Sequence, residues 1–175
     1  REACASIITD KYAEGYPGAR YYGGCEVADQ VEDIARQRAL QLFPGMFNAN
    51  VQPHSGTTAN MAVLQALAGT GGRIVGMQLS AGGHLSHGYP MSHTGRIFAA
   101  EHYGVNIASG LIDYDEVRDV SKKHQPAVLI AGASSYPRCI DYATMSEIAK
   151  EVGAVLMADI AHPAGLMAAG GMPSP

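Results

Sequence analysis

The sequence is poor in charged residues and contains no tryptophan. Of its 175 residues 16% are charged, and the formal net charge is −4. It has no run of lysine and arginine, so we expect no nucleic-acid partner. It also lacks an apolar run of the ~20 residues that a membrane-spanning helix needs, so we expect no membrane partner. The hydrophobic residues, at 47%, are enough to bury a core.

Cysteine is scarce as well. Cys4, Cys25 and Cys139 match neither the spacing of a zinc site nor a disulfide framework. We therefore expect ordinary thiols in a reducing compartment. The chain starts at Arg1 and ends in the loop-like sequence "GGMPSP", so we expect a fragment of a longer protein.

Strand-like and helix-like segments alternate after residue 25. Segments typical of strands occupy residues 48–52, 73–79, 127–134 and 154–161. Segments typical of helices lie within residues 26–43, 54–72, 113–126 and 143–153. The strands are continuously apolar, as in a parallel sheet that is buried on both faces. The sequence therefore predicts an α/β fold with a mostly parallel central sheet.

The segment "PHSGTTAN" is expected to open the second of these helices. Thr57 or Thr58 is expected to cap the helix, and Gly69 to end it. A Ser-Gly-Thr turn at a helix start presents free backbone N–H groups and hydroxyls, which suit a phosphate. The segment is neither a P-loop nor a dinucleotide fingerprint, and an ordinary capped helix remains the alternative.

Two polar residues stand at the ends of predicted strands. Ser134 is the last residue of the predicted strand at 127–134, and Asp159 ends the apolar run of "VLMADIAHPAGL". Ligands of such sheets bind beyond the carboxyl ends of the strands. A buried carboxylate needs a positive or donor partner. The candidates are an internal Arg or Lys, a metal, or a protonated ring nitrogen such as that of pyridoxal phosphate.

The loop at residues 80–95 contains "GGHLSHG". His84 and His87 are three residues apart and His93 follows, which allows a zinc hypothesis, but no thiolate joins them. A histidine in a glycine-rich loop can instead stack on a planar ligand, or simply lie on the surface. A phosphate site, a flat histidine and a strand-end Asp together suit one pyridine ring with a phosphate arm. We therefore expect no metal.

The first 25 residues are rich in tyrosine and glycine. In "KYAEGYPGARYYGG", Glu14 lies between Tyr12 and Tyr16, and Tyr21 and Tyr22 follow. Tyrosines in such a braced loop can serve as hydrogen-bond donors or acid–base groups. A loop of aromatic packing residues is the alternative.

The chain resembles serine hydroxymethyltransferase over nearly all of its 175 residues. The resemblance rests on the segments "KYAEGYPG", "RYYGGCE", "NVQPHSGTTANMAV", "GGHLSHG", "GLIDYDEV", "AGASSYPR" and "DIAHPAGL". It implies a partial large domain of a fold-type I pyridoxal phosphate transferase. Residues 1–25 would form a dimer-interface and active-site loop, and residues 26–175 part of the cofactor-binding domain.

The resemblance also implies roles for single residues. The implied cofactor-binding residues are Ser55, Gly56, Thr57, His84, Ser134, Asp159 and His162. The implied catalytic residues are Tyr12, Glu14, Tyr22, His84, Asp159 and His162. The implied substrate and folate contacts are Tyr12, Glu14, Tyr21, Tyr22, Leu79, Gly83 and Leu85. In this scheme the Ser-Gly-Thr turn holds the phosphate, His84 stacks on the ring, Asp159 binds the ring nitrogen, and Ser134 and His162 contact the ring hydroxyl region.

The implied reaction interconverts serine and tetrahydrofolate with glycine and 5,10-methylenetetrahydrofolate. Pyridoxal 5'-phosphate would be the cofactor and tetrahydrofolate the co-substrate. Tyr12 and Glu14 would enter the active site of a neighbouring subunit, in a homodimer or tetramer with shared sites. The expected compartment is the cytoplasm, with mitochondria and plastids as alternatives.

The chain departs from the family in its lysines. It has only Lys11, Lys122, Lys123 and Lys150, and none stands at the position of the Schiff-base lysine, which the family carries beyond "AHPAGL". The family's arginine for the substrate carboxylate also lies further along. We therefore expect the isolated chain to be inactive. One alternative is a truncated, non-catalytic homologue that pairs with or regulates a full-length subunit. Another is a related fold-type I enzyme such as a threonine aldolase, against which "KYAEGYPG" argues.

Overall fold

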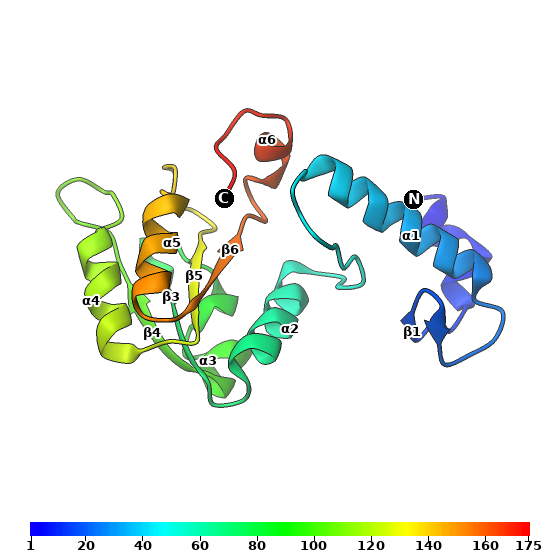
Figure 1. Ribbon diagram of the computed structural model, residues 1–175, viewed down its shortest axis with the longest axis horizontal. Helices are drawn as coiled ribbons and strands as arrows, with labels where there is room; N and C mark the ends of the chain where they lie inside the picture. Colours follow the sequence, from blue (N-terminus) through cyan, green and yellow to red (C-terminus); the bar gives the residue numbers. More distant parts are fainter. The chain divides into compact units, whose positions relative to one another are not determined.

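A four-stranded parallel sheet forms the centre of residues 55–175 (Figure 1). Its strands are β3 (Arg73–Met77), β4 (Ala99–Tyr103), β5 (Val128–Gly132) and β6 (Val155–Asp159), in the order β4-β3-β5-β6. Every neighbouring pair is parallel. The predicted α/β fold with a parallel sheet is thus confirmed.

The structure is a computed structural model that describes residues 1–175, with the side chain of Ala3 left out of the description. Its contacts divide the chain into two compact units, Arg1–His54 and Ser55–Pro175. The division expected after residue 25 concerns function, and it stays a prediction.

Burial differs between the central and the edge strands. All of β5, and all of β3 after its first residue, is buried, whereas β4 and β6 are partly exposed. The sequence "AAEHY" of β4 is not an apolar run, so this strand was not predicted. Edge strands have one open side and tolerate such residues. Three of the four strands, β3, β5 and β6, were thus predicted from their apolar runs, and β4 was not.

Helices cover both faces of the sheet. Figure 1 shows α4 (Tyr114–His124) and α5 (Tyr142–Glu151) on one side, and α2 (Gly56–Ala68) on the other. One core packs α4 and α5 on the sheet and includes Val75, Tyr103, Val117, Leu129, Met145 and Ile148. The second core packs α2 and the residues before β4, and consists of Leu64, Ile74, Phe98, Val128, Ile130 and Met157. The predicted helices in these segments are confirmed.

The remaining elements of this unit are short. They are η3 (Leu79–Ala81), η4 (Leu85–His87), α3 (His93–Ile97) and α6 (Ala164–Ala168). The first three lie in the segment that we expected to be a loop, so that expectation is wrong in part. Helices of three to five residues are too short to show a helical period in a sequence.

The unit Arg1–His54 contains η1 (Ala3–Ala5), η2 (Ile7–Asp10), a hairpin of β1 (Gly15–Tyr16) and β2 (Ala19–Arg20), and α1 (Glu26–Leu42). The helix predicted at 26–43 is confirmed, but it has no buried residue. Its apolar side chains Val27, Val31, Ile34 and Leu42 are each about half exposed or more. This apolar face lacks a partner among the residues that the structure describes.

The strand predicted at residues 48–52 is wrong. These residues belong to no strand of the described chain. Asn48 Oδ1 accepts a hydrogen bond from the N–H of Ala49, and Asn50 Oδ1 accepts one from the N–H of Gln52. Such local bonds compete with strand pairing.

In the described chain, no helix has both the length and the apolar character that crossing a membrane requires.

Candidate active site

A pocket of about 210 Å³ opens where β5 and β6 end and α2 begins. It is lined by Ser55, Gly56, Thr57, Asn60, His84, Ala133, Ser134, Asp159, Ala161 and His162. All seven residues predicted to bind a cofactor are among them. The structure thus brings together four segments of the chain between Ser55 and His162, although the role of each residue stays a prediction.

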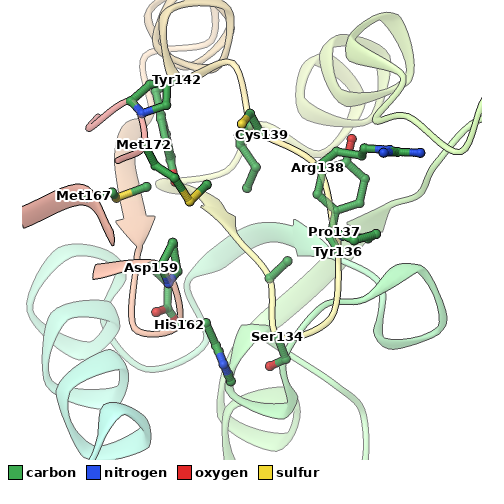
Figure 2. Close-up of a pocket in the computed structure, with 14 residues that line it drawn as sticks. Ser134, Tyr136, Pro137, Arg138, Cys139, Tyr142, Asp159, His162, Met167 and Met172 are labelled. Atoms are coloured by element: carbon green, nitrogen blue, oxygen red, sulfur yellow. The ribbon is translucent and has the colours of Figure 1, made fainter. Parts of the chain in front are cut away.

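A second cavity of about 330 Å³ adjoins this pocket, because Ala133, Ser134, Asp159 and His162 line both. In Figure 2, Asp159, His162 and Ser134 lie at one end of the cavity, and Tyr142, Met167 and Met172 lie towards the other. The polar groups therefore gather where the two spaces meet.

The strand end places Asp159 at the meeting point. Asp159 is the last residue of β6 and lies in register with Gly132, the last residue of β5. A Cβ atom on Gly132 would come within 2.7 Å of the Asp159 Cβ atom. Only glycine leaves room for the aspartate to take this position beside the neighbouring strand.

Three donors hold the carboxylate of Asp159. Its Oδ2 atom accepts hydrogen bonds from Asn60 Nδ2 and His87 Nε2, both at 2.8 Å, and its Oδ1 atom accepts one from the N–H of Ala161 at 3.1 Å. Burial alone would raise the pKa of Asp159, but the bonds from His87, Asn60 and Ala161 outweigh it and hold this pKa well below its usual range. Asp159 is therefore ionised at neutral pH. The alternative of an internal Arg or Lys partner is wrong for the described residues.

The hydrogen bonds of His87 define its tautomer. Its Nε2 atom donates to Asp159, while its Nδ1 atom accepts from the N–H of His84 at 3.4 Å. His87 thus turns its Nδ1 atom towards the backbone of His84 and its Nε2 atom towards the carboxylate. Asn60 and the N–H of Ala161 are neutral donors, and no Arg or Lys of the described residues pairs with Asp159.

Asn60 links Asp159 to the histidine loop. Its side-chain amide donates one hydrogen to Asp159 and the other to Ser86 Oγ at 2.8 Å. Ser86 Oγ in turn lies 2.7 Å from His84 Nδ1. Sequence reasoning missed Asn60 and Ser86, and it considered His87 only as a zinc ligand. Asn60 is the first buried residue of α2, and only the structure shows this burial.

His84 lies beside this network with its ring half-buried. Burial, followed by the neighbouring His87 and His162, lowers the pKa of His84 despite the opposite effect of Asp159. The ring is therefore neutral at neutral pH and suits contact with a flat ligand. Among the described side chains, no group of three or more His, Cys, Asp and Glu residues is arranged to hold a metal ion.

The first turn of α2 forms another wall of the pocket. The helix begins at Gly56, and Ser55 is its cap, so the prediction that Thr57 or Thr58 caps it is wrong. Ser55 Oγ accepts a hydrogen bond from the N–H of Thr58 at 3.2 Å. The N–H groups before Thr58 have no partner within the helix. A Cβ atom on Gly56 would meet nothing within 4 Å, so open space faces these groups. The end predicted at Gly69 is confirmed.

Ser134 is the clearest sign of a ligand. Its Oγ atom is buried and has no hydrogen-bond partner in the structure. Buried hydroxyls are nearly always bonded, because an unpaired one costs free energy. Ser134 lines both cavities, so a ligand hydroxyl there would satisfy it.

The residues expected at the folate site lie elsewhere. Leu79 and Leu85 are 41% and 48% exposed, and Gly83 lies between them against the backbone of Met77. None of the three lines either of the two cavities just described. A contact of these residues with folate stays a prediction.

The tyrosine loop belongs to the other compact unit. Tyr12 and Tyr22 stack edge to face with their ring centres 5.9 Å apart, and both are exposed. Glu14 and Tyr21 are also exposed. The structure describes this loop by itself, and its place at an active site stays a prediction.

The chain is an α/β protein with a parallel sheet. An ionised carboxylate, an open helix start and an unpaired hydroxyl meet at the ends of its strands. The family model of serine hydroxymethyltransferase matches residues 1–175, the whole chain. The chain belongs to the serine hydroxymethyltransferase family, a family of fold-type I, pyridoxal phosphate-dependent transferases. The resemblance found in the sequence is thereby confirmed.

Proposed function

We propose that this chain takes part in the pyridoxal phosphate-dependent interconversion of serine and tetrahydrofolate with glycine and 5,10-methylenetetrahydrofolate. The observation that carries the proposal is Asp159, an ionised carboxylate that three hydrogen-bond donors orient at the strand ends and that pairs with no Arg or Lys of the described residues. A protonated pyridine nitrogen is the cation that matches it. The family match supports the same reaction.

The residues present fit this cofactor. Ser55, Gly56 and Thr57 would hold its phosphate with the free N–H groups and hydroxyls at the start of α2. Ser134, whose hydroxyl is unpaired, would bind the ring hydroxyl together with His162. When bound, pyridoxal phosphate acts as an electron sink that stabilises a carbanion at the substrate.

The chain's own residues prepare this chemistry. Asp159 keeps a proton on the ring nitrogen, and His87 and Asn60 fix its Oδ2 atom in place. The neutral ring of His84 would contact the face of the cofactor and exclude water from it. Glu14 exchanges a proton with the substrate hydroxyl or the folate, and Tyr12 and Tyr22 contact the substrate.

We further propose a homodimer or tetramer in which Tyr12 and Glu14 serve the active site of a neighbouring subunit. The exposed apolar face of α1 supports association, because single chains rarely leave such a stripe uncovered. Serine, glycine and folate are the small-molecule partners. The proposed compartment is the cytoplasm.

The function is tested with the gene product that contains residues 1–175. We expect it to form glycine from serine only when both pyridoxal phosphate and tetrahydrofolate are present. Residues 1–175 expressed alone should give no glycine and no visible absorption band of covalently bound cofactor, because no lysine lines the pocket. If the gene product forms no glycine but binds a complete subunit of the family, the non-catalytic alternative replaces the proposal.

The phosphate contact gives a first prediction. Ser55→Ala should lower stability by about 1 kcal/mol, because it removes a helix cap, and should also weaken cofactor binding. Asp141→Ala is the matched control, since Asp141 caps α5 through the N–H of Thr144 and lies outside the pocket. It should lose similar stability with unchanged cofactor affinity. Equal affinities of the two variants in a cofactor titration would place the phosphate elsewhere.

A further inference from the structure

Arg20, the last residue of β2, is the centre of a hydrogen-bond network beside Glu14. Its side chain is only 6% exposed. The Nε atom donates to Asp29 Oδ1 at 2.7 Å, and one Nη atom donates to Glu32 Oε2 at 2.7 Å. The other Nη atom donates to the carbonyls of Ala13 at 2.7 Å and Gly15 at 2.8 Å. Four interactions thus fix a guanidinium that has five N–H donors.

The same network holds three successive carbonyl groups around Glu14. Arg20 binds the carbonyls on either side of it, and the N–H of Tyr21 donates to the carbonyl of Glu14 itself at 3.1 Å. Gln52 Nε2 adds a second donor to the carbonyl of Gly15 at 2.8 Å. By contrast, the Glu14 carboxylate accepts no hydrogen bond in the part of the chain that the structure describes, and it is exposed. The protein therefore fixes the backbone of Glu14, and with it the direction in which the side chain leaves the chain.

The network is anchored on α1. Asp29 and Glu32 are one turn apart on this helix, so both face Arg20. The N–H of Gly18 also donates to Asp29 Oδ2 at 3.0 Å. This bond, followed by the bond from Arg20, lowers the pKa of Asp29 and keeps the carboxylate charged. Glu32 Oε1 accepts from Gln52, which closes the ring of contacts.

We propose that Arg20 is a positioning residue, which acts through the backbone of residues 13–15 to aim the carboxylate of Glu14 at the reacting atoms. The inference rests on the proposed role of Glu14 as the acid–base group. Arg20 donates to both carbonyls that flank Glu14, so its contacts converge on the backbone at that residue. A proton-transfer group does need a fixed position, because a misplacement of about 1 Å can cost roughly 10²-fold in rate.

A double-mutant cycle in the gene product that contains residues 1–175, loaded with pyridoxal phosphate, tests this inference. Arg20→Ala should lower kcat for the tetrahydrofolate-dependent conversion of serine by about 10- to 100-fold. In a Glu14→Gln background the same change should cost less than about 2-fold, because the group that it positions is already lost. Arg20→Lys should keep the positive charge but make fewer hydrogen bonds. Its kcat should therefore lie between those of the wild type and Arg20→Ala.

Arg36→Ala is the matched control. Arg36 lies on α1 and bonds to Asp33, Asn48 and the carbonyl of Ala49, away from residues 13–15. We expect a change below about 2-fold for this variant in both backgrounds. If Arg20→Ala does not fold by circular dichroism, Gln52→Ala replaces it. This variant keeps Arg20 and removes one donor to the carbonyl of Gly15 and one to Glu32, with an expected loss of about 3- to 10-fold.

The outcomes separate the two levels of the proposal. If Glu14→Gln alone leaves kcat unchanged, the proposed role of Glu14 fails, and the inference on Arg20 fails with it. If Glu14→Gln lowers kcat but Arg20→Ala lowers it equally in both backgrounds, Arg20 is purely structural and only the inference is overturned. Loss of the Arg20 effect in the Glu14→Gln background supports it.

Discussion

Replacing Asp159 by Asn is expected to lower kcat of the loaded enzyme by roughly 10²- to 10³-fold, the usual loss on removal of one preorganised electrostatic contact. Asn keeps the shape of the side chain but brings no charge, so it cannot hold a proton on the ring nitrogen. Asp113→Asn is the matched control, because Asp113 caps α4 through the N–H groups of Asp115 and Glu116 and lies outside the pocket. It should leave kcat within about 2-fold.

Stability measurements give an independent check on the charge of Asp159. Its pKa in the folded protein lies below its unfolded value, so ionisation stabilises the fold above the ordinary aspartate pKa of about 3.9. This stabilisation is lost as the pH falls towards the folded pKa. The free energy of unfolding of the wild type should therefore exceed that of Asp159→Asn at pH 7, and the difference should shrink near pH 3. A difference that is independent of pH, or an unchanged kcat, would contradict the assignment.

Replacing Glu14 by Gln is expected to lower the tetrahydrofolate-dependent formation of glycine by about 10²- to 10⁴-fold, the range for loss of an acid–base group. Gln has nearly the same size and can still donate and accept hydrogen bonds, but it cannot exchange the proton. The absorption spectrum of the bound cofactor should stay the same, because none of the residues proposed to bind it changes. Rate and spectrum are measured on one preparation.

Glu26→Gln serves as the control for this prediction. Glu26 is an exposed residue in the first turn of α1, so it has the same chemistry in the same compact unit. We expect it to retain the wild-type rate. A fully active Glu14→Gln enzyme would show that the acid–base group lies elsewhere, while a changed spectrum would show that Glu14 acts on the cofactor site.

The central strands and the longer helices were predictable, and the partners of the site were not. The strands β3 and β5 are apolar because both faces are covered, and the period of α4 and α5 follows from burial on one side. The edge strand β4 and the short helices α3 and α6 lack these constraints, so their sequences carry little signal. The segment 48–52 was predicted to be a strand but forms none. The side chains of Asn48 and Asn50 accept hydrogen bonds from nearby backbone N–H groups, which compete with strand pairing.

The seven predicted cofactor residues share one pocket because the ends of β5 and β6 and the loop after β3 meet the start of α2. The donors that hold Asp159 could not be predicted from the sequence, because the tertiary structure brings them together. His87 and Asn60 are 72 and 99 residues away from it in the sequence, and nothing in their neighbourhoods indicates a carboxylate. The family resemblance implied the roles, while only the structure showed which donors hold Asp159.

The close approach of Gly132 to Asp159 has a consequence for natural variation in this gene. Gly132 carries no functional group, and in a strand it looks replaceable by alanine or valine. Yet an added Cβ atom would lie 2.6 Å from the carbonyl oxygen of Asp159 and 2.7 Å from its Cβ atom, so the aspartate would have to move. A single-nucleotide change at this codon that adds one methyl group would therefore have the phenotype of an active-site lesion, although the altered residue never touches a substrate.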